Sequence, residues 1–133
     1  MIYLHKYDSS TNKPVSSYVY NDEDATVALQ DAEAITKAPT DTHSARLIHA
    51  KGFYDVAAGT SSKFTDIFYN EEEMKLHVLY TGGAICEYSN VPVGVVHEID
   101  AVAERSESVG SWLAKNVELQ RKTGIKPYEY TYL

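Results

Sequence analysis

The feature that most constrains the fold is an alternation of side-chain character on either side of a glycine pair. Leu76, Val78 and Tyr80 recur at every second position, and the pattern resumes over residues 84–88. A period of two places such side chains on one face of a β-strand. The glycines at positions 82–83 supply the positive φ that a tight turn needs. The stretch therefore predicts an antiparallel hairpin.

Strand signals precede this hairpin and helix signals follow it. Residues 63–70 have the pattern of a strand, and Pro92 suits the first turn of a helix. That helix is amphipathic, because apolar residues recur in it at helical spacing. These residues are Val95, Val96, Ile99, Val102 and Ala103. Ser108 can cap a second helix, which Gly124 and Pro127 would end. Strands followed by helices predict an α+β fold, in which two C-terminal helices pack on one face of a mostly antiparallel sheet.

The N-terminal half adds a hairpin, one helix and a mixed strand. Residues 2–7 and 14–20 alternate as two strands joined by a turn rich in Ser, Asn and Pro. Residues 21–37 offer an N-cap, acidic first-turn groups and alanines at helical spacing, which predict a helix. A strand is expected over residues 45–54, where Gly52 marks a bulge or a close backbone approach.

Length and composition predict one domain that needs no cross-link. A chain of 133 residues with 44% apolar residues can bury a core without disulfides or a metal. Residues 1–60 form an unassigned extension, and residues 61–133 form the second half. The single cysteine, Cys86, fits a reducing compartment. Residues 1–7 carry no signal-peptide pattern, and no apolar run is long enough to span a membrane, so we expect a cytoplasmic protein.

The charge balance bears on possible partners. A net charge of −7 argues against a general nucleic-acid binder, because Lys and Arg carry the affinity for phosphates. A local site for a small anion stays open, since such a site needs only a few basic groups or backbone amides. Tyrosine is frequent, at 11 of 133 residues, and its apolar ring with a polar tip suits binding surfaces as well as half-buried sheets.

Catalytic and metal-binding signals are weak. Cys86 lies within a predicted strand, with no neighbouring signal that would lower its pKa. The five histidines do not occur at the spacings of metal sites, and His97-Glu98 lacks the second histidine of a zinc-protease helix. The acidic run at 71–73 reads as a solvated turn. We therefore expect a protein that is not an enzyme and has no cofactor or metal.

Binding candidates are concentrated at the ends of the predicted strands. Tyr80 and Tyr88 can stack on a base, because aromatic faces accept flat π systems. Alternatively, the ring of Tyr80 belongs to the core beneath the helices. Asn90 follows the last strand of the hairpin, where its amide can read a base edge or a ribose. Equally, Asn90 can cap the helix that begins near Pro92.

A second group of candidates surrounds the start of the second helix. Ser108, Gly110 and Ser111 open that helix, and first-turn amides favour an anion. Ordinary capping and close helix packing would explain the same three residues. The basic groups nearest the helices are Arg105, Lys115, Arg121 and Lys122, each of which can also be a solvated surface charge.

The order of motifs over residues 64–116 resembles a known family. The motifs run from an aromatic-ended strand through a glycine turn and Val-Pro to Ser-x-Gly and Asn, and the residues are Tyr69, Leu76, Val78, Tyr80, Gly83, Tyr88, Val91, Pro92, Ala101 or Ala103, Ser108, Gly110, Trp112 and Asn116. This order resembles the KTSC domain, a module named for its occurrence at the C terminus of some lysyl-tRNA synthetase sequences. The resemblance covers about the C-terminal half and extends at most to residue 133, and nothing similar is recognised for residues 1–60.

The layout is also similar to phage sponge proteins that inhibit the Thoeris defence system. In that family, an antiparallel sheet carries two C-terminal helices, and a dimer holds a cyclic ADP-ribose signal between sheet and helices. An aromatic residue and an asparagine at strand ends contact the nucleotide there, with arginines on the helices. The resemblance implies these roles for Tyr80, Asn90, Arg105 and Arg121, although the two arginines are not a close helical pair. A phage protein would act in the host cytoplasm.

Three functions are therefore expected as alternatives. The first is a non-enzymatic protein that sequesters a cyclic nucleotide or ADP-ribose-type immune signal. The second is an RNA- or tRNA-associated accessory domain, and the third is a structural protein–protein module. Residues 128–133 alternate as a strand without an obvious partner nearby in sequence. We therefore expect a homodimer or a higher homo-oligomer, in which this segment or the second helix crosses toward the partner.

Overall fold

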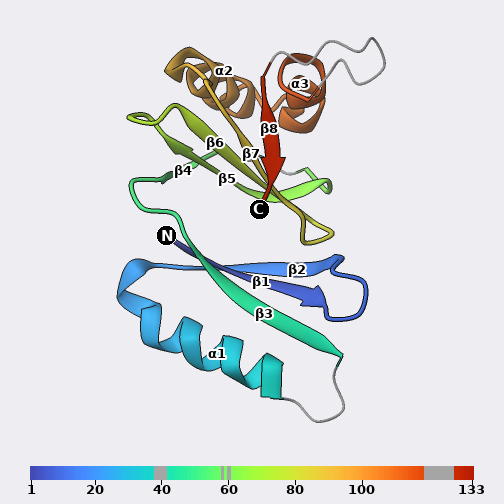
Figure 1. The fold of residues 1–133 in the computed structure, drawn as a ribbon. Helices are drawn as coiled ribbons and strands as arrows, with labels where there is room; N and C mark the ends of the chain where they lie inside the picture. The colour runs from blue at the N-terminus through green and yellow to red at the C-terminus, as the bar shows by residue number, and fades with distance from the viewer. Residues whose placement is uncertain (38–41, 58, 60, 119–127) are drawn as a thin grey trace. The chain divides into compact units, whose positions relative to one another are not determined.

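The chain divides into two compact units, each with its own antiparallel sheet (Figure 1). The computed structural model describes residues 1–37, 42–57, 59, 61–118 and 128–133. The first unit holds residues 1–52 with 82–84, and the second holds residues 53–81 with 85–133. The predicted α+β class is confirmed, with one helix in the N-terminal half and two near the C terminus. The strands form two sheets, whereas the sequence led us to expect one.

In the first unit, a three-stranded sheet carries a single helix. Its order is β2-β1-β3, and both pairings are antiparallel. The bounds are β1 Ile2–Asp8, β2 Pro14–Tyr20, the 3-10 turn η1 Asp22–Asp24, α1 Ala25–Lys37 and β3 His43–His49. The central strand is the most buried, with Tyr3 and Leu4 fully inaccessible. The helix buries only the small side chains of Ala28 and Ala32, which allow it to lie close to the sheet.

In the second unit, five strands follow one another across the sheet in chain order. Each strand pairs antiparallel with the next, and two helices cover one face (Figure 1). The bounds are β4 Tyr54–Val56, β5 Phe64–Asn70, β6 Lys75–Tyr80, β7 Ile85–Tyr88, α2 Val93–Glu104, α3 Val109–Asn116 and β8 Tyr130–Tyr132. The connections from β5 to β6 and from β6 to β7 are short, at residues 71–74 and 81–84, as antiparallel neighbours allow.

The core of the second unit confirms the predicted alternation. Leu76 and Val78 of β6 and Cys86 of β7 are fully buried beneath the helices. Ile99 of α2 and Leu113 of α3 close this core from the helix side. The same spacing places Tyr80 and Tyr88 at the ends of their strands on this face, where Tyr80 is partly buried. The amphipathic faces of sheet and helices therefore meet as the sequence predicts.

Two strands differ from their predicted form. The expected strand over residues 45–54 is two strands in different sheets, β3 and β4. They separate at Gly52, whose φ of +82° turns the chain out of the extended conformation. The C-terminal strand β8 also finds a partner in its own chain, because it pairs with β7 through Cys86, Glu87 and Tyr88.

The third helix is shorter than expected. It ends at Asn116, and the predicted stop at Gly124 and Pro127 lies outside the described residues. The chain then turns back, because the amide of Glu118 donates to the carbonyl of Leu113 over 2.8 Å. Leu113 is fully buried, whereas Trp112 is only partly buried.

Candidate functional site

Two tyrosine hydroxyls meet beneath the helices of the second unit. The Tyr80 and Tyr88 hydroxyl oxygens lie 3.2 Å apart, and either hydroxyl can be the donor. Tyr80 ends β6 and Tyr88 ends β7, and because these strands are antiparallel, with Tyr88 opposite Leu76, the two residues lie at opposite ends of the pair. Both side chains are on the same face, where they reach toward each other until their hydroxyls meet. Burial raises the pKa of both hydroxyls well above the usual value for tyrosine. Both therefore stay protonated at neutral pH and can donate a hydrogen bond.

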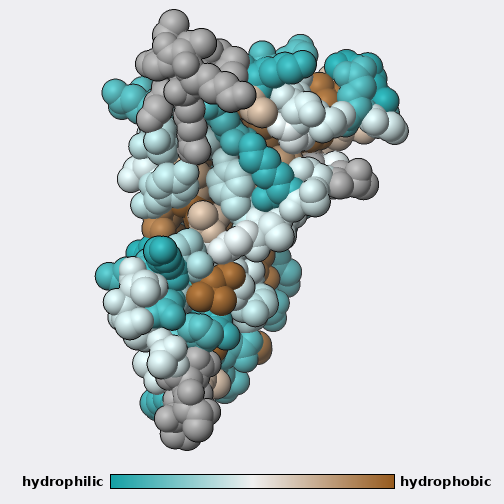
Figure 2. Space-filling view, turned by 90° about the vertical axis from the view of Figure 1, so that its right-hand side faces the viewer, coloured by the Kyte–Doolittle hydropathy of each residue, from teal (hydrophilic) through white to brown (hydrophobic). Residues whose placement is uncertain are grey.

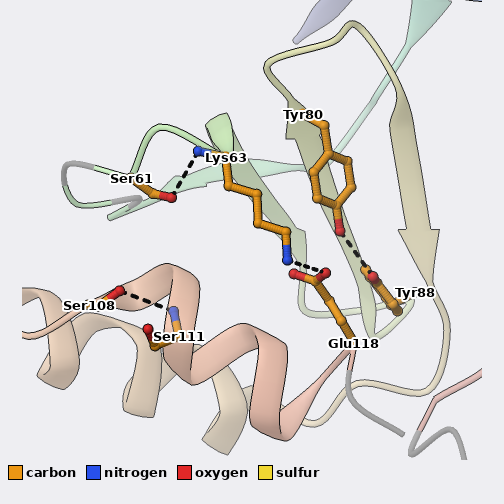
Figure 3. A network of polar contacts seen from close by, with 7 residues as sticks. All are labelled: Ser61, Lys63, Tyr80, Tyr88, Ser108, Ser111 and Glu118. Atoms are coloured by element: carbon orange, nitrogen blue, oxygen red, sulfur yellow. Dashed lines mark hydrogen bonds and ion pairs between the residues drawn. The ribbon is translucent and has the colours of Figure 1, made fainter. Parts of the chain in front are cut away.

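An ion pair between a half-exposed lysine and a nearly buried glutamate lies beside these hydroxyls (Figure 3). The Lys63 ammonium is 2.8 Å from Oε2 of Glu118, and the Glu118 side chain is only 9% exposed. The second carboxylate oxygen, Oε1, is buried without a hydrogen-bond partner among the described residues. The nearby Glu118 charge adds to the raised pKa of the Tyr80 and Tyr88 hydroxyls, because a negative charge disfavours their ionised form.

The start of α3 adjoins the loop that leads to Lys63. Ser108 caps the helix, because its Oγ accepts a hydrogen bond from the Ser111 amide over 3.1 Å. Ser61 Oγ likewise accepts a hydrogen bond from the Lys63 amide. A Cβ on Gly110 would lie 2.9 Å from Ser61 Oγ, so the glycine permits the loop and the helix to approach this closely. The capping role predicted for Ser108 is thus confirmed.

Asn90 has the geometry of a turn residue rather than of a helix cap. It is exposed, and its φ is +58°, a conformation in which asparagine is enriched. The N-cap of α2 is Pro92, which makes no side-chain cap hydrogen bond. The capping alternative for Asn90 is therefore wrong, and its side chain stays at the end of β7.

The other predicted residues either lie away from this cluster or fall outside the described residues. Arg105 is exposed after α2, and its Nε donates to Oε1 of Glu107 over 3.0 Å. Asn116 donates through Nδ2 to the carbonyl of Trp112, and Lys115 is an exposed residue in the last turn of α3. These side chains are not part of the tyrosine and glutamate cluster drawn in Figure 3. Arg121 lies outside the described residues.

The sequence prediction missed Lys63 and Glu118. Both looked like ordinary surface charges, one at the start of a strand and one on an expected helix. The residue that could have indicated the position of Glu118 is Val117, which lies four residues after Leu113 and is buried with it. Because the helix ends at Asn116, the acidic residue directly after the buried Val117 lies close to the core.

No group of three or more His, Cys, Asp and Glu side chains is arranged to hold a metal among the residues described. Cys86 is buried in the core. His77 Nε2 lies 2.8 Å from Glu87 Oε2, and its ring stacks on Phe53 at 3.9 Å. Over the same described ranges, no helix has the length and apolar character needed to cross a bilayer.

The surface shows no single large apolar area on the face displayed in Figure 2. Hydrophobic residues appear there in small separate groups among polar ones. A large continuous apolar area is the usual mark of a protein–protein interface.

Comparison with protein-family models and with curated protein sequences gave no match to this chain.

Proposed function

We propose that this chain is a non-enzymatic nucleotide-binding protein that sequesters a cyclic nucleotide immune signal, in the manner of the phage proteins that it resembles. One observation carries the proposal. A cation, a carboxylate that is only 9% exposed and two tyrosine hydroxyls lie together beyond the end of α3, and the loop before Lys63 leads back to the serine-capped start of that helix; the four residues are Lys63, Glu118, Tyr80 and Tyr88. The KTSC-like order of motifs over residues 64–116 is part of the same proposal.

The cluster offers a place for an anion. The Lys63 side chain is 47% exposed while its ammonium contacts Glu118, so its remaining donors can face a bound phosphate. The amides in the first turn of α3 lack intrahelical acceptors and carry the positive end of the helix dipole. Ser61 Oγ lies next to Gly110 at that turn. Together these groups favour a phosphate despite the net negative charge of the chain.

The same cluster offers hydrogen bonds at some distance from that anion site. The eight residues of α3 span ~12 Å at the usual rise of an α-helix. Lys63 connects the loop at the helix start with Glu118 beyond the helix end. A ligand with a phosphate at one end and a polar base at the other fits this separation, and nucleotides have that form.

The chemistry favours binding over turnover. A general base or nucleophile needs a pKa near or below neutrality, whereas the pKa of both tyrosine hydroxyls is raised by burial. Sequestration requires only binding, and two copies of the chain in a homodimer would hold two ligands. Asn90, exposed after the end of β7, would reach the ligand from the same protomer or its partner.

The test is binding without turnover. The full chain is titrated calorimetrically with a panel of cyclic mononucleotides, cyclic dinucleotides and cyclic ADP-ribose isomers, then denatured, and the released ligand is identified by mass spectrometry. We expect one class to bind and to return intact, with sedimentation velocity giving the mass of a dimer. Release of a hydrolysed product would contradict a sponge, and the absence of binding across the panel would contradict the nucleotide proposal.

A matched pair of variants locates the site. Lys63→Met should weaken binding roughly tenfold or more, because a charged hydrogen bond to the phosphate is lost. The control is Lys37→Met, since Lys37 also pairs with a glutamate but lies on α1. The double variant Lys63→Met/Glu118→Gln removes the charge that Lys63→Met leaves unpaired. Equal affinity of the Lys63 and Lys37 variants would place the ligand elsewhere.

A further inference from the structure

The hydrogen-bonding capacity of the buried cluster is not fully used. Glu118 Oε1 is inaccessible and has no hydrogen-bond partner among the described residues, whereas Oε2 contacts Lys63. The two tyrosine hydroxyls carry two protons, but the contact between them uses only one. One acceptor and one donor thus remain beside each other. A buried carboxylate oxygen without a partner is costly, so this arrangement favours a group that completes it.

A ligand that satisfies both groups must have a hydrogen-bond donor and an acceptor on adjacent atoms of one edge. The donor must face Glu118 Oε1, and the acceptor must face the hydroxyl proton of Tyr80 or Tyr88. An aromatic amine next to a ring nitrogen has this pattern, as in the 6-amino edge of adenine. An oxopurine presents a carbonyl at the same position, where it would face the carboxylate and be repelled.

We propose that Glu118, with the Tyr80–Tyr88 pair, selects a nucleotide whose base carries an exocyclic amino group beside a ring nitrogen and rejects the corresponding oxo base. This inference rests on the proposed function, because it assigns the base end of the nucleotide to the cluster and leaves the phosphate to Lys63 and the start of α3. Glu118 is then the residue that determines specificity.

The experiment compares two ligands that differ only at this edge. Adenosine 3′,5′-cyclic monophosphate and inosine 3′,5′-cyclic monophosphate are titrated into the full chain by calorimetry, together with the amino and oxo forms of whichever class binds in the panel above. We expect the amino form to bind roughly tenfold or more tightly, because a buried carboxylate facing a carbonyl is left without a partner.

Variants then assign the preference to its residues. Glu118→Gln should reduce the preference to within about threefold, because an amide can rotate to accept or to donate. Tyr80→Phe should weaken binding of the amino form roughly tenfold while keeping the ring. Glu107→Gln is the matched control, since Glu107 also pairs with a basic side chain but lies on the exposed turn before α3. Thermal melting confirms that each variant is folded.

The outcomes separate the two proposals. Binding of both forms with equal affinity by the unmodified chain overturns the selection by Glu118 but leaves nucleotide binding in place. A preference that persists in a folded Glu118→Gln variant also overturns it, and so does water as the only occupant of the cluster in a crystal structure of the nucleotide complex. The absence of any nucleotide binding overturns the proposed function itself.

Discussion

At the scale of single residues, burial decides between two neighbours on α3. Leu113 is fully buried, while Trp112 is only partly buried. Leu113→Ala should therefore lower the free energy of unfolding by about 2–5 kcal/mol, through lost transfer energy and a cavity. Trp112→Ala should cost less, although tryptophan is larger. Urea unfolding of both variants tests the order, and a larger loss for Trp112→Ala would show that its ring is the main anchor of the helix.

The relative burial of Trp112 and Leu113 did not follow from the sequence, because hydrophobicity alone does not say which side of a helix faces the sheet. Leu113 and Val109 occupy the buried stripe, one turn apart, and Trp112 lies beside that stripe. Glu118 was missed for a related reason, since its position depends on where α3 ends. By contrast, Ser108 was predicted correctly because a cap depends on the residues directly next to it.

At the scale of elements, the cap of α3 is expected to contribute measurably to stability. Ser108→Ala removes the acceptor of the Ser111 amide and should cost about 1 kcal/mol. Ser108→Asp keeps an acceptor and adds a charge that favours the helix start, so it should restore most of that loss. Both variants are compared by urea unfolding. If Ser108→Ala were as stable as the unmodified chain, the cap would be energetically unimportant.

Local patterns also predicted most elements closely. The strand β2 and the hairpin it forms with β1 follow from alternation and turn chemistry. The division of residues 45–54 between two sheets did not follow, because a glycine in a strand pattern indicates a bulge as readily as a break. The sign of φ at Gly52 decides between them, and it depends on the surrounding fold.

At the scale of the whole molecule, two buried histidines link stability to pH. Burial lowers the pKa of His5 and of His77, with Arg46 adding to the first shift and Glu87 opposing the second. The unfolded chain therefore binds more protons than the folded chain between the folded-state pKa values and about 6.5. Stability should consequently fall as the pH drops from 7 through 6.5, and it should level off below the folded-state values.

Unfolding in urea at a series of pH values between 7 and 5 measures this slope. The double variant His5→Gln/His77→Gln should have a flatter profile over that range, whatever its stability at pH 7. His97→Gln is the control, because His97 is exposed on α2. An unchanged slope in the double variant would assign the pH dependence to other groups.

The position of β8 affects the order in which the strands of its sheet pair during folding and separate during local opening. The other strands of its sheet pair with chain neighbours, but β8 pairs with β7 only after residues 89–129 have been traversed. Closing such a loop costs more entropy than closing a turn, and β8 contributes only three residues. It is therefore the last strand to join and the first to open, so its amides should exchange with solvent fastest in that sheet. Because the ring of Tyr130 packs against that of Tyr88, each brief opening would uncover the buried hydroxyl pair and give a ligand its route in and out.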